Sequence, residues 1–282
     1  MNKIIFIADF FADQVAGGGE LNNEIVIKDL SEKGHKVEKI NSHSASVQVL
    51  ESMKNDFFII SNFINLPPDS KEYIKKNCDY VIYEHDHKYL KSRNPAEYED
   101  YLAPEEEIVN YDFYKSAKSV FCQSKFHSEI VRKNLKLDNI LNLGGNLWLE
   151  SDLEKMEEYS SREKNNGCSI MESIVDHKNT KGSVVYCKSK GYDYQLIEPC
   201  PYHEFLDRIS KNERFVFFPL TPETLSRVVV EARMMNMKVI TNKRVGATSE
   251  DWFELKGIEL IDFMRKKRKE IIEKVEEAIG GQ

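Results

Sequence analysis

The sequence lacks long apolar runs and closely spaced cysteines. No stretch approaches the roughly 18 apolar residues that a membrane-spanning helix requires, and 31% of the residues are charged. The cysteines are odd in number, and no two of them form a Cys-x-x-Cys pair: Cys78, Cys122, Cys168, Cys187 and Cys200. We therefore expect a soluble globular protein with reduced thiols and with neither a disulfide nor a zinc framework.

A signal-peptide pattern is also missing. The apolar run at residues 4–7 is too short, and no small-residue cleavage site follows it. These residues predict a first strand instead. Together with the absence of a disulfide framework, they favour a cytoplasmic protein.

Basic residues are fewer than acidic ones, 40 against 47, which gives a net charge of -7. This balance argues against a nucleic-acid partner, whose binding surface would be basic. The run 265–269 is a local exception. Because an apolar stripe lies beside it, at Ile271, Ile272, Val275 and Ile279, the run predicts the solvated face of a C-terminal helix. Contact with a membrane surface is the alternative.

Strand and helix patterns alternate along the first half of the chain. A helical spacing begins at Glu20 and stops at Gly34, and a second helix at 126–135 could be capped by Ser124. The predicted strands are 4–8, 37–40, 57–60, 80–83 and 119–122. Such alternation predicts right-handed crossovers and a doubly wound parallel sheet in a first domain, residues 1–144.

A polar segment separates this domain from a second alternating series. Residues 145–166 predict an exposed connector that could contain a short helix. The second domain, 167–262, has predicted strands at 169–175, 183–187, 194–197, 214–218, 238–241 and 258–261. A C-terminal helix at 263–282 could cross back onto the first domain. The fold class is therefore α/β, with two Rossmann-like domains whose sheets face a cleft.

Two glutamates, Glu223 and Glu231, lie eight residues apart after the apolar run 215–219. If the strand ends at Pro219 and a helix begins near Glu223, both carboxylates face the carboxyl edge of the sheet, where a small polyhydroxy ligand could bind. As an alternative, Glu223 only caps the helix. Glu231 has apolar neighbours, so its carboxylate requires a cationic or hydroxyl-bearing partner.

Two further motifs follow strands of the first domain. Gly17, Gly18 and Gly19 precede the first helix, where backbone N–H groups could hold a phosphate or the glycines could simply form a tight turn. His85 and His87 end the strand 80–83. They could hydrogen-bond a substrate or handle a proton, they have the spacing of some metal pairs, and an ordinary polar loop is the third interpretation.

In the second domain, the loop 175–182 contains Lys178 and Lys181. Lysines at the end of a strand could pair with a diphosphate as point charges. A solvated loop without a ligand fits the same composition.

These motifs together resemble the retaining glycosyltransferases of the GT-B fold, in particular glycosyltransferase family 4. The resemblance is carried by the glycine loop with Glu20, by Lys181-Gly182, by Glu223 and Glu231 with seven residues between them, and by the segments 217–223, 239–242 and 246–247. It is specific around residues 215–247 and loose elsewhere. It implies transfer of a sugar from a nucleotide-diphosphate donor to a carbohydrate, lipid-linked or other acceptor.

The resemblance also implies roles for the residues of the second domain. The residue matching Glu223 lies against the donor sugar, the one matching Glu231 hydrogen-bonds the ribose, and the one matching Lys181 meets the diphosphate. Thr221 and Thr224 are expected to line the same donor site. The family usually places an arginine beside the lysine, and residues 171–174 contain none.

For the first domain, the resemblance implies that the loop of Gly17, Gly18 and Gly19 approaches the donor phosphates and that His85 or His87 contacts the sugar. The reaction needs no metal and no cofactor besides the donor. Two other functions stay open: a catalytically silent GT-B subunit that binds a partner or a nucleotide sugar, and a nucleotide-sugar epimerase.

Overall fold

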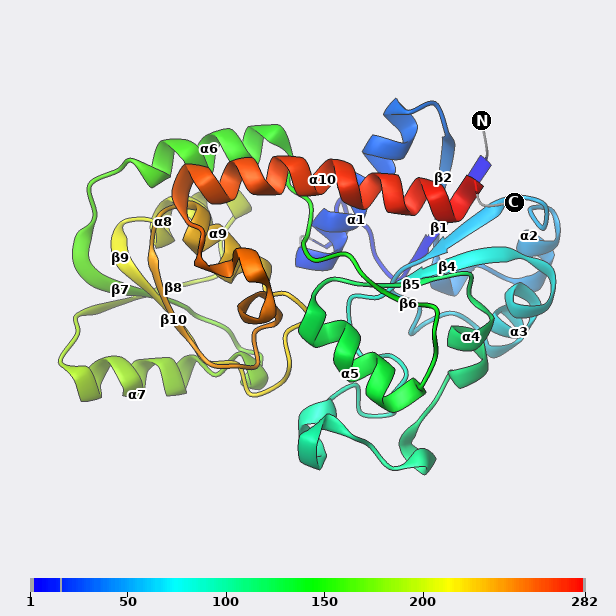
Figure 1. The fold of residues 1–282 in the computed structure, drawn as a ribbon, viewed down its shortest axis with the longest axis horizontal. Helices are drawn as coiled ribbons and strands as arrows, with labels where there is room; N and C mark the ends of the chain where they lie inside the picture. The colour runs from blue at the N-terminus through cyan, green and yellow to red at the C-terminus, as the bar shows by residue number, and fades with distance from the viewer. Residues whose placement is uncertain (1–2, 16, 281–282) are drawn as a thin grey trace. The chain divides into compact units, whose positions relative to one another are not determined.

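Parallel strands alternate with helices along the chain (Figure 1). The structure, a computed structural model, describes residues 3–15 and 17–280. The chain divides into two units: the N-terminal unit, Met1–Leu147 with Arg268–Gln282, and the C-terminal unit, Trp148–Lys267.

The described part of the N-terminal unit contains a six-stranded parallel sheet in the order β2-β1-β3-β4-β5-β6. Its strands are β1 (Lys3–Ala8), β2 (Lys36–Asn41), β3 (Phe57–Ile60), β4 (Asp79–Tyr83), β5 (Val120–Cys122) and β6 (Ile140–Asn142). β1 and β3 are almost wholly apolar and buried, as expected for strands covered on both faces. The five predicted strands of this unit are confirmed, and β6 was not predicted.

The helices of the N-terminal unit follow these strands. They are α1 (Gly18–Glu32), α2 (Val47–Glu51), α3 (Pro68–Asn77), α4 (Tyr111–Ser116) and α5 (Lys125–Leu135), with short 3₁₀ turns at Ser42–Ser44, Pro95–Glu97, Glu99–Tyr101 and Glu105–Glu107. α1 begins two residues before the predicted start at Glu20. The predicted cap of α5 is confirmed, because Ser124 Oγ accepts the N–H of His127 at 3.1 Å.

The C-terminal unit contains, in its described residues, a four-stranded parallel sheet in the order β10-β9-β7-β8. Its strands are β7 (Asn165–Met171), β8 (Tyr194–Ile197), β9 (Asn212–Phe217) and β10 (Lys238–Thr241). Helix α7 (Thr180–Lys190) covers one face, and α8 (Tyr202–Ile209) and α9 (Arg227–Met234) cover the other (Figure 1). Short 3₁₀ turns lie at Asp176–Lys178, Gly246–Ser249 and Asp251–Glu254.

Two predicted strands of this unit are wrong. Residues 183–187 lie in α7, which Asn179 caps at its start and Gly191 ends in the left-handed conformation. Residues 258–261 lie in α10 (Gly257–Gly280). Both segments are rich in β-branched or large apolar residues, which short windows do not distinguish from strands. Their buried positions follow helical spacing instead, as with Ser183 and Cys187.

Half of the segment predicted as an exposed connector, which was allowed a short helix, forms a packed helix. This helix, α6 (Glu150–Ser160), buries Leu153, Met156 and Tyr159 in the core of the C-terminal unit. Three apolar residues at a spacing of three are enough to bury one face of an otherwise charged helix.

Helix α10 begins in the C-terminal unit and ends in the N-terminal unit. Within the C-terminal unit, Arg265 pairs with Glu150 and Glu157 at 2.7 and 3.3 Å. Within the N-terminal unit, the Arg268 guanidinium binds both carboxylate oxygens of Asp29. The two arginines of the basic run therefore form ion pairs inside the fold.

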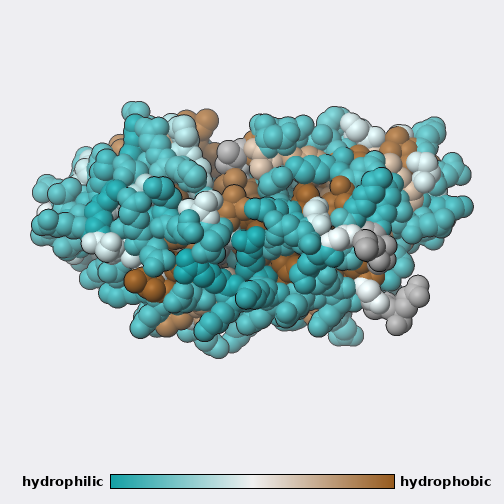
Figure 2. Space-filling view, turned by 90° about the horizontal axis from the view of Figure 1, so that it is seen from above, coloured by the Kyte–Doolittle hydropathy of each residue, from teal (hydrophilic) through white to brown (hydrophobic). Residues whose placement is uncertain are grey.

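Figure 2 shows one face of the molecule, which is mostly hydrophilic with scattered hydrophobic residues. In the ranges that the structure describes, no helix is long and apolar enough to cross a membrane.

Candidate functional site

Each sheet has one point at which the strand order reverses. In the N-terminal unit this point lies between β1 and β3, and in the C-terminal unit it lies between β7 and β9. The loops that follow such neighbouring strands diverge to opposite faces of the sheet, which leaves a crevice at their carboxyl ends. Gly17 lies after β1 and Glu223 lies after β9, at these two positions. His85 and His87 follow β4, one strand further along the sheet, and Lys181 and Glu231 lie in α7 and α9.

Glu223 and Lys178 meet at this position of the C-terminal unit. Lys178, from the loop after β7, lies with its Nζ 2.7 Å from Oε1 of Glu223, in the loop after β9. Their side chains are 29% and 14% exposed, so the pair is accessible from one side. Each partner compensates the charge of the other, and solvent still reaches both side chains.

Glu223 does not begin a helix, contrary to the prediction. It forms an isolated parallel bridge with Val245, in which the Glu223 N–H donates to the Arg244 carbonyl at 2.8 Å and its own carbonyl accepts from Gly246 at 2.9 Å. Helix α9 starts only at Arg227, after Ser226 in a left-handed conformation with φ of 71°. The bridge therefore fixes the Glu223 backbone, and the interpretation of Glu223 as a helix cap is wrong.

The loop that carries Lys178 is ordered by Asn179. The Asn179 side chain accepts the N–H of Gly182 at 3.1 Å and donates to the Phe218 carbonyl at 2.8 Å, so it ties the start of α7 to the end of β9. A Cβ on Gly182 would overlap the Asn179 amide. Lys181 lies in the first turn of α7 with an exposed side chain. The structure thus brings Lys178, not Lys181, into contact with Glu223.

Glu231 is almost fully buried, and its Oε1 is surrounded by donors. It accepts from Trp148 Nε1 at 2.9 Å and from the Tyr202 hydroxyl at 2.7 Å, and Nε of Arg227 lies 2.8 Å away. The sequence argument that this carboxylate needs a cationic or hydroxyl partner is confirmed.

Arg227 is itself buried beside aromatic rings. Its guanidinium lies 4.7 Å from the ring centroid of Trp148 and 5.7 Å from that of Tyr202. Burial alone would lower the pKa of Arg227, but Tyr202 and Glu231 outweigh it and raise that pKa. Sequence reasoning missed Arg227, although its position four residues before Glu231 on one helix was a usable signal.

Thr221 and Thr224 flank Glu223 in the chain and are both partly buried. They lie in the loop between β9 and α9, close to Glu223 in the sequence. Their role in a donor site stays a prediction.

The glycine loop and His85 lie together in the N-terminal unit. Gly17 is the residue before α1, and Gly18 and Gly19 form its first turn. A Cβ on Gly19 would lie 3.3 Å from the His85 ring, so the absence of a side chain permits this close packing.

Both ring nitrogens of His85 are engaged. Nε2 lies 2.6 Å from Asn23 Oδ1, and Nδ1 contacts the side-chain amide of Gln123. Because Asn23 presents an acceptor and Gln123 a donor, the contacts favour the neutral tautomer with its proton on Nε2. Burial, helped by the nearby Lys88 charge, lowers the pKa of His85 to about 3.

His87 points into the interior of the unit. It is 2% exposed, and its Nδ1 lies 3.2 Å from the Tyr89 hydroxyl. Burial lowers the pKa of His87 to about 4. The two histidines are therefore neutral at pH 7 and do not share one environment.

A buried ion pair that sequence reasoning missed lies beside them. Lys88 Nζ is 2.7 Å from Glu84 Oε1, and the two side chains are 2% and 0% exposed. The other Glu84 oxygen accepts from the Tyr114 hydroxyl. Burial raises the pKa of Glu84. The spacing of Glu84 and Lys88, four residues, was visible in the sequence, but their burial was not.

Within residues 3–15 and 17–280, no group of three or more His, Cys, Asp or Glu side chains is placed to hold a metal ion. His85 and His87 differ in their contacts. Both ring nitrogens of His85 contact other side chains, whereas Nδ1 of His87 lies beside the Tyr89 hydroxyl.

Comparison with known proteins identifies proteins of similar fold. No family model and no curated protein sequence matches the chain. Several solved structures do. HepE of Anabaena, in complex with UDP and glucose, is 13% identical with a TM-score of 0.56, over 99% of this chain and 92% of that one. The catalytic domain of Arabidopsis thaliana starch synthase IV, bound to ADP and acarbose, is 12% identical with a TM-score of 0.58, over 99% and 95% of the two chains.

WaaG, a glycosyltransferase involved in lipopolysaccharide biosynthesis, is 11% identical with a TM-score of 0.55, over 98% and 94% of the two chains. These likenesses and the two parallel-sheet units show that the chain has the GT-B fold. The predicted fold class is confirmed.

Proposed function

We propose that this protein transfers a sugar from a nucleotide-diphosphate donor to a hydroxyl group of an acceptor, with retention of anomeric configuration. The observation that carries the proposal is the accessible Lys178–Glu223 pair at the strand-order reversal of the C-terminal unit. The GT-B fold and the nucleotides bound to HepE and to starch synthase IV support it.

The chemistry requires stabilisation of the leaving group. The bond between the sugar C1 and the diphosphate oxygen breaks, and the electron pair stays on the diphosphate. The acceptor oxygen forms the new bond to C1 on the same face, and its proton passes to the departing phosphate oxygen. A fixed cation and N–H groups at a helix start stabilise this charge without a metal. Lys178 and the first turn of α7 provide both.

In this scheme Lys178 changes partner when the donor binds. In the structure described here it neutralises Glu223 at 2.7 Å. We propose that the diphosphate attracts the Lys178 ammonium, which frees the Glu223 carboxylate to accept hydroxyl groups of the donor sugar. Lys181 is exposed one turn further and is a second candidate for the diphosphate.

The other predicted contacts keep their place in the proposal. Gly17, Gly18 and Gly19 would approach the donor phosphates, and His85, neutral and held by Asn23 and Gln123, would need to exchange one of these partners to touch the sugar. His87, Thr221 and Thr224 stay predictions. For Glu231, a ribose contact would have to coexist with three donors that already surround Oε1.

The proposal is tested with a panel of nucleoside diphosphates and their sugar derivatives, UDP-glucose included. We expect thermal stabilisation by at least one nucleotide. Glu223→Gln should lower donor hydrolysis or transfer at least about 100-fold with little change in nucleotide affinity, because it removes a contact to the reacting sugar. Lys178→Met should weaken nucleotide binding about 10-fold or more, because a charge-assisted contact is lost.

Matched controls are available in the same unit. Lys188→Met, on the exposed part of α7, and Glu213→Gln, at an exposed position of β9, should leave binding and turnover unchanged. If Lys181→Met impairs nucleotide binding and Lys178→Met does not, Lys181 is the diphosphate ligand. Transfer should persist in EDTA.

The rival functions give different results. A silent subunit would bind a nucleotide without releasing sugar to any acceptor, and an epimerase would interconvert donor sugars with no acceptor present. If no nucleotide stabilises the protein, the proposed transferase function is wrong.

A further inference from the structure

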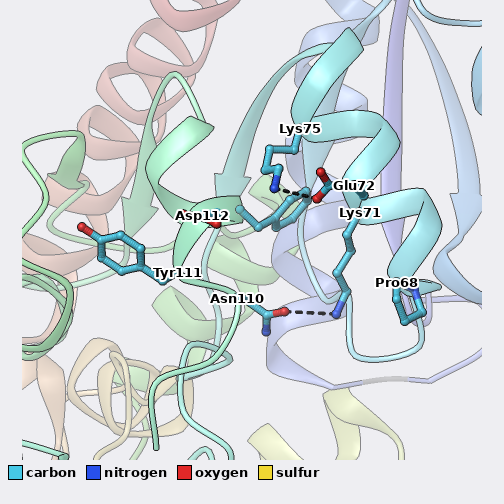
Figure 3. A pocket seen from close by; sticks show the side chains of 8 residues that line it. Pro68, Lys71, Glu72, Lys75, Asn110, Tyr111 and Asp112 are labelled. Carbon is cyan, nitrogen blue, oxygen red and sulfur yellow. Dashed lines mark hydrogen bonds and ion pairs between the residues drawn. The ribbon is translucent and has the colours of Figure 1, made fainter. Parts of the chain in front are cut away.

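A pocket lies between two helices of the N-terminal unit, and its lining includes none of the site residues discussed above. The first turns of α3 and the residues that lead into α4 line it, and its volume is about 440 Å³ (Figure 3). This is within the usual range of small-molecule sites, roughly 300–1,000 Å³. Its polar lining comes mainly from Lys71, Lys75, Glu72, Asn110 and Asp112.

Lys71 is the distinctive residue of this pocket. Its Nζ lies 3.2 Å from Oδ1 of Asn110 and 5.5 Å from the ring centroid of Phe63. Among the described residues, no carboxylate lies within ion-pair distance of this ammonium, and Asp9 acts on it only from further away. Burial lowers the pKa of Lys71.

The neighbouring lysines of α3 differ in this respect. Lys75 and Lys76 both pair with Glu72, at 2.6 and 2.8 Å. Figure 3 shows Lys75 directed to Glu72 and Lys71 directed to Asn110. A half-buried cation whose polar partner is a neutral amide retains much of its capacity to bind an anion, because its charge is not compensated.

A second hydrogen bond holds the Asn110 side chain in place. Its Nδ2 donates to the Lys88 carbonyl at 2.8 Å, and its backbone adopts φ of 57°, a left-handed conformation that asparagine tolerates. This hydrogen bond fixes the amide oxygen toward Lys71. The pocket therefore offers a prearranged ammonium next to an amide. The carboxylates of Glu72 and Asp112, which can accept hydroxyl groups, line the same pocket at a greater distance from the ammonium.

We propose that the α3–α4 pocket binds a small sugar that carries a phosphate or carboxylate group, with Lys71 as the ligand of the anionic group. The hydroxyl groups donate to the oxygens of Asn110, Asp112 and Glu72. The site does not depend on sugar transfer. Its test is a binding experiment without any nucleotide sugar, so its failure and that of the proposed function are distinguishable.

The test is titration calorimetry of the full chain with glucose 6-phosphate, glucuronate, glucose and inorganic phosphate. We expect the two charged sugars to bind, glucose to bind at least about 10-fold more weakly, and inorganic phosphate to bind more weakly than glucose 6-phosphate. The ratio between glucose 6-phosphate and glucuronate tells which anion the site prefers.

Variants locate the site. Lys71→Met should weaken binding of the charged sugars at least 10-fold, Lys71→Arg should retain most of it, and Lys54→Met, at an exposed position outside the pocket lining, should change nothing. Glu223→Gln should bind these probes as the unaltered protein does. Circular dichroism of each variant checks that it folds.

Any of the following results would overturn the inference: neither charged sugar binds, Lys71→Met binds them as tightly as the unaltered protein, or glucose binds as tightly as glucose 6-phosphate. Tighter binding of inorganic phosphate than of glucose 6-phosphate would reject the sugar as the ligand.

Discussion

At the scale of single residues, two lysine–glutamate pairs of this protein differ in their burial. Glu84 and Lys88 are both enclosed and compensate one another at 2.7 Å, whereas Lys178 and Glu223 form a pair of the same length that solvent can reach. Breaking the buried pair would leave an uncompensated charge, which typically costs about 3–5 kcal/mol. The accessible pair can exchange partners at a much lower cost.

The buried histidines predict a dependence of stability on pH. The pKa of His87 is about 4 in the folded protein, because burial disfavours the charged ring, and about 6.5 in the unfolded chain. Below about pH 6.5 the unfolded chain binds a proton that the folded protein does not. Urea unfolding should therefore show full stability above pH 6.5 and a loss of about 1.4 kcal/mol per pH unit for this residue as the pH falls toward 4.

His87→Phe should reduce the slope of the free energy of unfolding against pH by about 1.4 kcal/mol per pH unit, which corresponds to one proton. His43→Gln, at an exposed position, should leave this slope unchanged. An unchanged slope in His87→Phe would show that His87 is protonated in the folded protein. His85 should account for a further part of the slope, because burial lowers its pKa to about 3.

At the scale of elements, short apolar segments were the main source of error. Strands such as β3, β8 and β10 were predicted at their observed bounds, because their β-branched and aromatic residues lie between clear turns. Residues 183–187 have a similar composition but belong to α7. The helix forms there because Asn179 caps its start and Gly191 ends it. A window of five residues includes neither of these two positions.

The start of α9 gives a prediction at this scale. Ser226 has φ of 71°, which costs an L-residue roughly 1–2 kcal/mol. Over the described part of the chain, no hydrogen-bond partner is found for its buried Oγ. Ser226→Gly removes both penalties at the cost of greater backbone entropy. It should raise the free energy of unfolding by about 1 kcal/mol in urea denaturation.

Ser226→Ala is the matched variant, because it removes the hydroxyl but keeps the left-handed backbone strain. Its stability should fall between that of the unaltered protein and that of Ser226→Gly. A Ser226→Gly protein less stable than Ser226→Ala would contradict the strain argument, and a Ser226→Ala protein less stable than the unaltered protein would mean that the hydroxyl contributes an interaction.

At the scale of the whole molecule, the last helix completes the unit in which the chain begins. Residues from Arg268 onward belong to the N-terminal unit, where Glu276 pairs with Lys33 at 2.6 Å and Lys274 donates to the Asn142 carbonyl at 3.2 Å. The folding of this unit therefore depends on residues that lie far apart in the chain.

Ile271→Ala tests this dependence. Ile271 is fully buried, and its truncation should lower the free energy of unfolding by about 2–5 kcal/mol. Hydrogen exchange should show the loss of protection in β1 and α1. Glu277→Ala, at an exposed position of α10, is the control. Loss of protection confined to the C-terminal unit would contradict the assignment of this half of α10.

The sequence by itself determined the fold class and most strands, because apolar periodicity and turn residues act over short distances. Only the tertiary structure decided that Lys178, 45 residues from Glu223, is the lysine that contacts it, and that Arg227, Tyr202 and Trp148 enclose Glu231. Side chains that are distant in the chain meet only when β7 and β9 pair. Local patterns carry no information on that pairing or on the burial that sets the charges of these groups.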